Sequence, residues 1–251
     1  MKPRTGMSFA LALLLLPQAA HAADHLLSTG HNELDTTITV NATDTFHVDL
    51  TANHSYACDA IPFDAASDFD WSTTVQGTAS GSPESIVART AGSITPVITG
   101  ESNGVADNRI VFTPTTSDRF VLTVQSAKSG GEDVRIRCLD TTLYGGFNTN
   151  VNDFNFLELT NVSNAQITAK VTAINYDGTV AINGQSVVID PTRRLDVDIH
   201  TPAGANKYGM IIVTHNGPAG ALKGNVSQYS GNVNNFDLAG SEPLRPIEQN
   251  P

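Results

Sequence analysis

The chain has 251 residues, of which 25 are acidic and 14 are lysine or arginine, so its formal net charge at pH 7 is −11. This length fits one large sandwich or two domains of ordinary size. The acidic balance repels phosphate backbones and argues against nucleic acid as a partner.

Residues 1–22 have the pattern of a secretory signal peptide. Lys2 and Arg4 precede an unbroken apolar run over residues 9–16, which is too short to span a bilayer. Ala20-His21-Ala22 supplies a small-x-small cleavage signal. We therefore expect cleavage directly after this tripeptide. The mature chain is predicted to have no membrane span and to be periplasmic, secreted or bound at the cell surface.

The mature sequence alternates apolar and polar residues at a period of two. The pattern is clear over residues 46–50, 167–173 and 195–199. Such alternation predicts strands with one face on a core and the other in water. Asp177-Gly178 and Asn183-Gly184 are typical of tight hairpin turns. The predicted fold class is all-β, with two consecutive antiparallel β-sandwich domains of jelly-roll or immunoglobulin-like type.

The same pattern suggests domain boundaries. Residues 23–34 are interpreted as an N-terminal extension, residues 35–140 as the first sandwich and residues 141–229 as the second. Residues 230–251 lose the alternation and collect asparagine, glycine, glutamate and proline. We expect them to form a flexible C-terminal tail.

Cys58 and Cys138 are the only cysteines. An isolated pair in an exported protein usually forms a disulfide, because the compartment is oxidising. The bond would close a loop of about 80 residues, which stabilises by roughly 4 kcal/mol in the chain-entropy model. The alternative is two buried free thiols.

Residues 44–50, 55–58 and 109–124 carry a family resemblance. The last of these segments has a strand ending in Phe-Thr-Pro, then a turn, then an aromatic strand. In this it resembles the bacterial pre-peptidase C-terminal domain, a small secreted β-sandwich. The resemblance implies a jelly-roll-like module that accompanies other exported modules. Residues 156–161 and 213–218 more loosely resemble immunoglobulin-like or fibronectin-like modules of bacterial exported proteins, which implies no residue-level function.

One acidic stretch suggests a metal site. Its four candidate ligands are Asp59, Asp64, Asp68 and Asp70. Calcium takes six to eight oxygen ligands, typically loop carboxylates and carbonyls, so the stretch suggests a calcium site. The alternative is a solvated acidic loop. The histidines have no recognisable zinc spacing.

The sequence offers little for catalysis. Ser102 lies in a Gly-x-Ser-x-Gly pattern, but the following segment is predicted to be a strand where a nucleophile elbow needs a helix. We predict no catalytic residues, no enzymatic activity and no organic cofactor. Trp71, Tyr144 and Tyr176 could build a sugar-stacking platform, although nothing in the sequence groups them.

The sequence therefore favours a non-enzymatic interaction module of the surface, matrix or envelope that binds an extracellular protein or glycan. The expected contact regions are residues 59–70, 77–105 and 202–207. A structural subunit of a surface filament or layer is one alternative, with self-assembly through the chain ends at 23–34 and 230–251. A calcium-assisted carbohydrate-binding protein is another.

Overall fold

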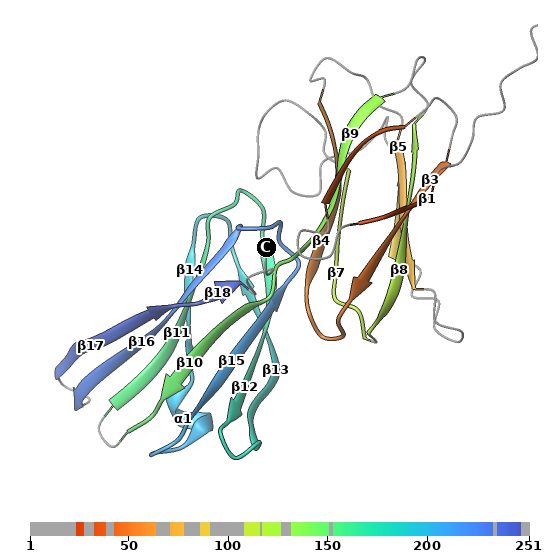
Figure 1. Ribbon diagram of the computed structural model, residues 1–251. Helices are drawn as coiled ribbons and strands as arrows, with labels where there is room; N and C mark the ends of the chain where they lie inside the picture. Colours follow the sequence, from red (N-terminus) through yellow and green to blue (C-terminus); the bar gives the residue numbers. More distant parts are fainter. Residues whose placement is uncertain are drawn as a thin grey trace, which may run out of the picture.

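The computed structural model describes residues 24–27, 33–38, 43–63, 71–77, 86–90, 108–115, 117–126, 132–150, 153–232 and 235–246. Within these ranges the chain is almost entirely β-strand (Figure 1), which confirms the predicted all-β class. The one helix among the described residues has four residues, so none of the described helical structure could cross a membrane.

The first half contributes two sheets, with strand orders β1-β3-β8-β5-β6 and β2-β9-β4-β7. Neighbouring strands are antiparallel, except that β1 runs parallel to β3. The strands are β1 (Asp24–Leu26), β2 (Glu33–Ile38), β3 (Thr43–Leu50), β4 (Tyr56–Pro62), β5 (Trp71–Gly77), β6 (Ile86–Thr90), β7 (Asn108–Phe112), β8 (Asp118–Ser126) and β9 (Glu132–Asp140).

The second half contributes two further sheets, with strand orders β13-β12-β15-β10-β18 and β14-β11-β16-β17. The change from one pair of sheets to the other falls between Asp140 and Leu143. The elements are β10 (Leu143–Asn148), β11 (Asp153–Asn161), β12 (Ile167–Asn175), β13 (Val180–Ile189), β14 (Arg194–Asp198), α1 (His200–Ala203), β15 (Tyr208–His215), β16 (Leu222–Asn232), β17 (Asn235–Pro243) and β18 (Arg245–Pro246).

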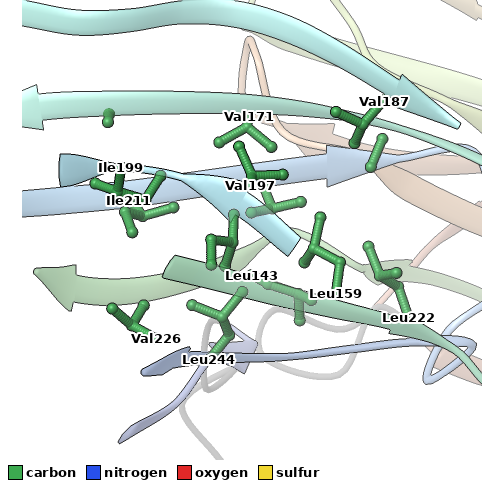
Figure 2. Close-up of a cluster of buried hydrophobic side chains, with 14 of the residues drawn as sticks. Leu143, Leu159, Val171, Val187, Val197, Ile199, Ile211, Leu222, Val226 and Leu244 are labelled. Carbon is green, nitrogen blue, oxygen red and sulfur yellow. The ribbon is translucent and has the colours of Figure 1, made fainter. Parts of the chain in front are cut away.

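Each half has its own cluster of buried apolar side chains. In the first half, Phe46, Phe120 and Leu122 come from one sheet and Val134 and Ile136 from the other. Figure 2 shows the second cluster, which side chains from both sheets of the second half build. The inward positions follow the period of two in the sequence, because successive strand residues point to opposite faces.

Cys58 and Cys138 lie directly opposite each other on the neighbouring strands β4 and β9. Their sulfur atoms are bonded and both residues are fully buried, which confirms the predicted disulfide. The bond therefore joins two adjacent strands of one sheet, and it closes the long loop that carries β5, β6, β7 and β8.

One prediction about the local chain path needs correction. Asn183-Gly184 lies inside β13, where the register with β12 shifts, so it forms an irregularity in the strand and not a second hairpin turn. After β13 the chain crosses to the other sheet, where β14 pairs with β11. Sequence alternation cannot show these features, since it reports the face of a residue and not its partner strand.

The interpretation of residues 230–251 as a flexible tail is wrong for the part that the structure describes. β16 extends to Asn232, and β17 and β18 follow it. Between them, Leu244 crosses from one sheet to the other and is only 8% exposed. Gly145 and Gly224 leave the space for its side chain: a Cβ atom on either would lie within 3 Å of a Leu244 methyl group.

The N-terminal segment 23–34 is also partly built into the sheets. β1 adds to the edge of one sheet, the Leu27 side chain is buried in the core, and β2 begins at Glu33. β1 and β17 are both outer strands of their sheets. The prediction that these chain ends join neighbouring copies stays a prediction.

Leu244 should be essential for the stability of the second half. Replacing Leu244 by alanine should lower the free energy of unfolding by about 2–4 kcal/mol, because it leaves a cavity between two sheets. Leu238→Ala is the matched control, since Leu238 is 60% exposed on the neighbouring β17 and should change stability by less than about 0.5 kcal/mol. Urea denaturation followed by circular dichroism measures both. Equal effects would contradict the anchoring role of Leu244.

The disulfide should stabilise the first half selectively. The double variant Cys58→Ala, Cys138→Ala should destabilise this half by about 4 kcal/mol and leave the second half unchanged. Trp71 is the only tryptophan, so its fluorescence reports the first half alone. Circular dichroism reports both halves. If the two signals shift together in the variant, the halves unfold as one unit and the predicted division into two domains fails.

Candidate binding surface

Two exposed tyrosines stack on the outer face of the β13-β12-β15-β10-β18 sheet. Tyr176 is 69% exposed and Tyr208 is 52% exposed. Their ring centroids lie 4.5 Å apart, with 17° between the ring planes. The backbone N–H of Tyr176 donates to the carbonyl of Tyr208 at 2.8 Å. The two rings are therefore held side by side by main-chain pairing.

A row of apolar side chains continues this surface across three strands. Ile174 on β12 pairs with Val180 on β13 and with Met210 on β15. Val180 is exposed, Met210 is 43% exposed and Ile174 is partly buried. We call the set of Ile174, Tyr176, Val180, Tyr208 and Met210 the tyrosine face. Contiguous exposed apolar surface of this kind marks an interaction site more often than scattered single residues do.

Polar contacts hold the loops beside the tyrosine face. Asp177 accepts hydrogen bonds from the hydroxyl and backbone N–H of Thr179 and pairs with Lys207 at 3.0 Å. These bonds, the Thr179 side-chain bond foremost, hold the pKa of Asp177 well below its ordinary value. Thr149 also bonds the main chain at Gly204 and Lys207. The loops on either side of the two tyrosines are therefore short and held in place by hydrogen bonds.

The tyrosine face lies at the end of the second half that points away from the first half. Figure 1 shows α1 and the β12–β13 turn at this end. The predicted contact loop 202–207 leads directly into Tyr208. The other predicted loop region, 77–105, lies largely outside the described residues.

The structure groups the aromatic residues differently from the sequence-based expectation. Tyr176 belongs to the tyrosine face, as part of a predicted aromatic platform. Its stacking partner Tyr208 was not predicted. Tyr144 pairs with Ile212 in a neighbouring row, and its hydroxyl is bound to His54. Trp71 lies in β5 of the first half. Only strand pairing could reveal Tyr208, because it lies 32 positions from Tyr176 in the sequence.

A polar chain connects the two halves of the protein. His54 Nδ1 lies 2.7 Å from Asp140 Oδ2, and the Tyr144 hydroxyl lies 3.0 Å from His54 Nε2. Burial raises the pKa of Tyr144 to about 12, and the nearby Asp140 and Tyr56 add to the rise. The phenol is therefore a protonated hydrogen-bonding group at neutral pH, which makes it a poor nucleophile.

Asp59, the first residue of the predicted calcium site, lies in strand β4 and not in a loop. It is buried, and Arg137 on β9 binds both of its carboxylate oxygens, at 2.6 and 3.1 Å. Asp64, Asp68 and Asp70 lie outside the described residues. Among the described residues no group of three or more acidic, histidine or cysteine side chains converges as a metal site. Calcium binding stays a prediction.

The nucleophile-elbow pattern at Ser102 lies outside the described residues. Its predicted flanking strand is present as β7, Asn108–Phe112. The prediction that Ser102 is not catalytic therefore stays a prediction.

A histidine is buried where the second half meets the first. His215 lines a cavity of about 310 Å³ together with Leu139, Leu143 and Lys223. The backbone N–H of Gly217 donates to its Nδ1 at 3.1 Å, and the main chain of Thr141 also hydrogen-bonds the ring. Burial lowers the pKa of His215 to about 4. The ring is therefore neutral in the folded protein at physiological pH.

Comparison with known proteins identifies no family. No protein-family model matches the sequence, and no curated protein matches it. The chain is similar in structure to CorA of Methylomicrobium album BG8, a surface-associated copper-binding protein important in copper acquisition. The identity is 12%, the match covers 49% of this chain and 100% of CorA, and the TM-score is 0.37.

The chain is also similar to a protein of Parabacteroides distasonis ATCC 8503 that is named as secreted. The identity is 7%, the match covers 84% of this chain and 80% of the other, and the TM-score is 0.26. Both TM-scores are below 0.5, so neither likeness supports a functional argument. The resemblance to the pre-peptidase C-terminal domain stays a prediction.

His215 should make stability depend on pH. Its pKa is about 4 when folded and about 6.5 when unfolded, so between these values the unfolded chain binds a proton that the native protein does not. The contribution of the neutral His215 ring to the free energy of unfolding is fully present above about pH 6.5. About 3 kcal/mol of this free energy should be lost as the pH falls to 4. Urea denaturation across this range measures the loss. In His215→Phe the slope between pH 6.5 and 5 should flatten; a slope equal to that of the wild type would contradict the assignment.

Proposed function

We propose that this protein is an exported, non-catalytic interaction module that binds an extracellular glycan or protein through the tyrosine face. The observation that carries the proposal is the stacked, exposed pair of Tyr176 and Tyr208 on a rigid sheet. Tyrosine offers a large contact area with little loss of side-chain freedom on binding. Its ring faces suit sugars and apolar side chains, and its hydroxyl group can hydrogen-bond.

The location of the tyrosines supports this function. Strand pairing and the Asp177–Lys207 contact fix the surface before any ligand arrives. A preorganised surface has less conformational entropy to lose on binding, so more of the contact energy appears as affinity. The inner face of the same sheet is packed in the core, where Val171, Ile211 and Val213 are fully buried.

The disulfide and the predicted signal peptide support export. A buried bond between Cys58 and Cys138 persists in an oxidising compartment and is rare in cytosolic proteins. The acidic net charge favours solubility outside the cell and disfavours anionic ligands. Neutral glycans or protein surfaces are therefore the expected ligand classes.

Removing either tyrosine should weaken binding. Tyr176→Ala and Tyr208→Ala should each lower affinity about tenfold or more, which corresponds to about 1.4 kcal/mol or more for an aromatic anchor. Binding is measured by affinity electrophoresis in neutral polysaccharides and by co-sedimentation with native envelope fragments. The thermal midpoint should stay within a few degrees, because both side chains are exposed.

Val162→Ala is the matched control, because Val162 is 54% exposed and lies between β11 and β12, outside the tyrosine face. It should bind like the wild type. If both tyrosine variants bind as well as this control, the tyrosine face is not the binding surface.

A further inference from the structure

The predicted mature chain begins with Ala23-Asp24-His25, which places a histidine third from a free amino group. We propose that this N-terminus is a Cu²⁺ site. The four ligands are the α-amino nitrogen of Ala23, the backbone nitrogens of Asp24 and His25, and Nδ1 of the His25 ring. The proposal rests on the export and cleavage proposed above, and it is independent of the tyrosine face.

The chemistry of these atoms suits copper. Four nitrogen ligands in one plane are the arrangement that Cu²⁺ prefers, and Cu²⁺ binds nitrogen sites more tightly than the other common divalent metals. Neither Asp24 nor His25 is proline, so both carry a backbone N–H that can ionise. The site therefore needs one histidine and the main chain, and no cluster of acidic or sulfur ligands.

The proton and charge balance is simple. Each of the two backbone amides loses one proton to solvent, and the two resulting negative charges neutralise Cu²⁺. The α-amino group and the imidazole release whatever protons they hold at that pH, since their ordinary pKa values are about 7.7–8.0 and 6.5. No electron is transferred, so the metal stays Cu²⁺.

The first strand is positioned so that its beginning can detach. Among the described strands β1 pairs with β3 alone, as the outer strand of its sheet, and it has three residues. The following residue, Leu27, is buried and its backbone N–H donates to the carbonyl of His47 at 2.9 Å. Copper binding needs to free only Asp24 and His25 while Leu27 stays anchored. Opening a chain end at a sheet edge breaks few hydrogen bonds, each worth about 0.5–1.5 kcal/mol.

The environment of the His25 ring also favours release. The ring stacks on Phe46 with centroids 4.9 Å apart, but its buried Nε2 atom has no hydrogen-bond partner. Asp44 Oδ2 lies 3.9 Å from this nitrogen, beyond hydrogen-bond distance. A buried polar nitrogen without a partner is unfavourable. Moving the ring to a metal at the chain end therefore costs the stacking contact and no hydrogen bond of Nε2.

Copper titration of the exported, purified protein tests the proposal, after its intact mass has been measured. The expected mass is that of a chain beginning at Ala23. Competition with a chelator of known affinity should show one tight Cu²⁺ per chain, with proton release and the visible absorption band of a planar four-nitrogen complex.

Four variants separate this site from other histidines and from the tyrosine face. His25→Ala, and a chain with one glycine inserted before Ala23, should each bind Cu²⁺ about 100-fold or more weakly, since losing a direct ligand costs at least as much as losing an outer-shell partner. His31→Ala is the matched control and should bind like the wild type. Tyr176→Ala should also bind copper normally, so failure of the tyrosine proposal leaves this one intact.

Three outcomes would overturn the proposal. The first is a mature chain that begins at a residue other than Ala23. The second is a correctly processed protein without tight Cu²⁺ binding. The third is a His25→Ala variant that retains the affinity and absorption band of the wild type.

Discussion

Burial of alternate strand residues between paired sheets is the interaction on which the rest of this structure depends. In each half, inward side chains from both sheets fill a single apolar cluster. This packing fixes the inner faces and leaves the outer faces free to vary. The tyrosine face exists because the other side of its sheet is held by Val171, Ile211 and Val213. The same tight packing makes Leu244 important for the stability of the second half. Its side chain fits only because Gly145 and Gly224 lack a Cβ atom.

The region between the halves follows a different physical rule. It is built from polar groups that satisfy one another: His54 joins Asp140 and Tyr144, and Ser55 bonds Thr141 and Thr142. Buried polar groups are stable when each has a partner, and costly when one partner is lost. A histidine linked to an aspartate and a hydroxyl resembles a catalytic arrangement by composition. The three side chains are partly buried, and their hydrogen bonds link the end of the first half to the start of the second.

The two proposed binding features sit on different parts of the chain. The tyrosine face lies on the second half, far from the start of the first, and consists of side chains on a preformed sheet. The proposed copper site is the chain end itself and uses main-chain nitrogens. Each feature can therefore be lost without the other. Together they describe an exported protein that contacts its surroundings through rigid aromatic surface and through a processed N-terminus.

The sequence by itself determined the all-β class and the Cys58–Cys138 bond, because strand periodicity and redox compartment are local or compositional properties. It also named Tyr176 as a candidate for a sugar-stacking platform, together with Trp71 and Tyr144, which lie elsewhere in the structure. It placed residues 230–251 in a tail because this stretch collects asparagine, glycine, glutamate and proline and lacks alternation, although the end of β16 and all of β17 lie within it.

Only the tertiary structure shows that Tyr208 stacks on Tyr176 and that the Asp59 carboxylate binds Arg137. It also shows that the Leu244 side chain packs between two sheets. Each of these depends on which strands become neighbours and in what register. The period of two shows which face of a strand is buried, and it carries no information about the partner strand.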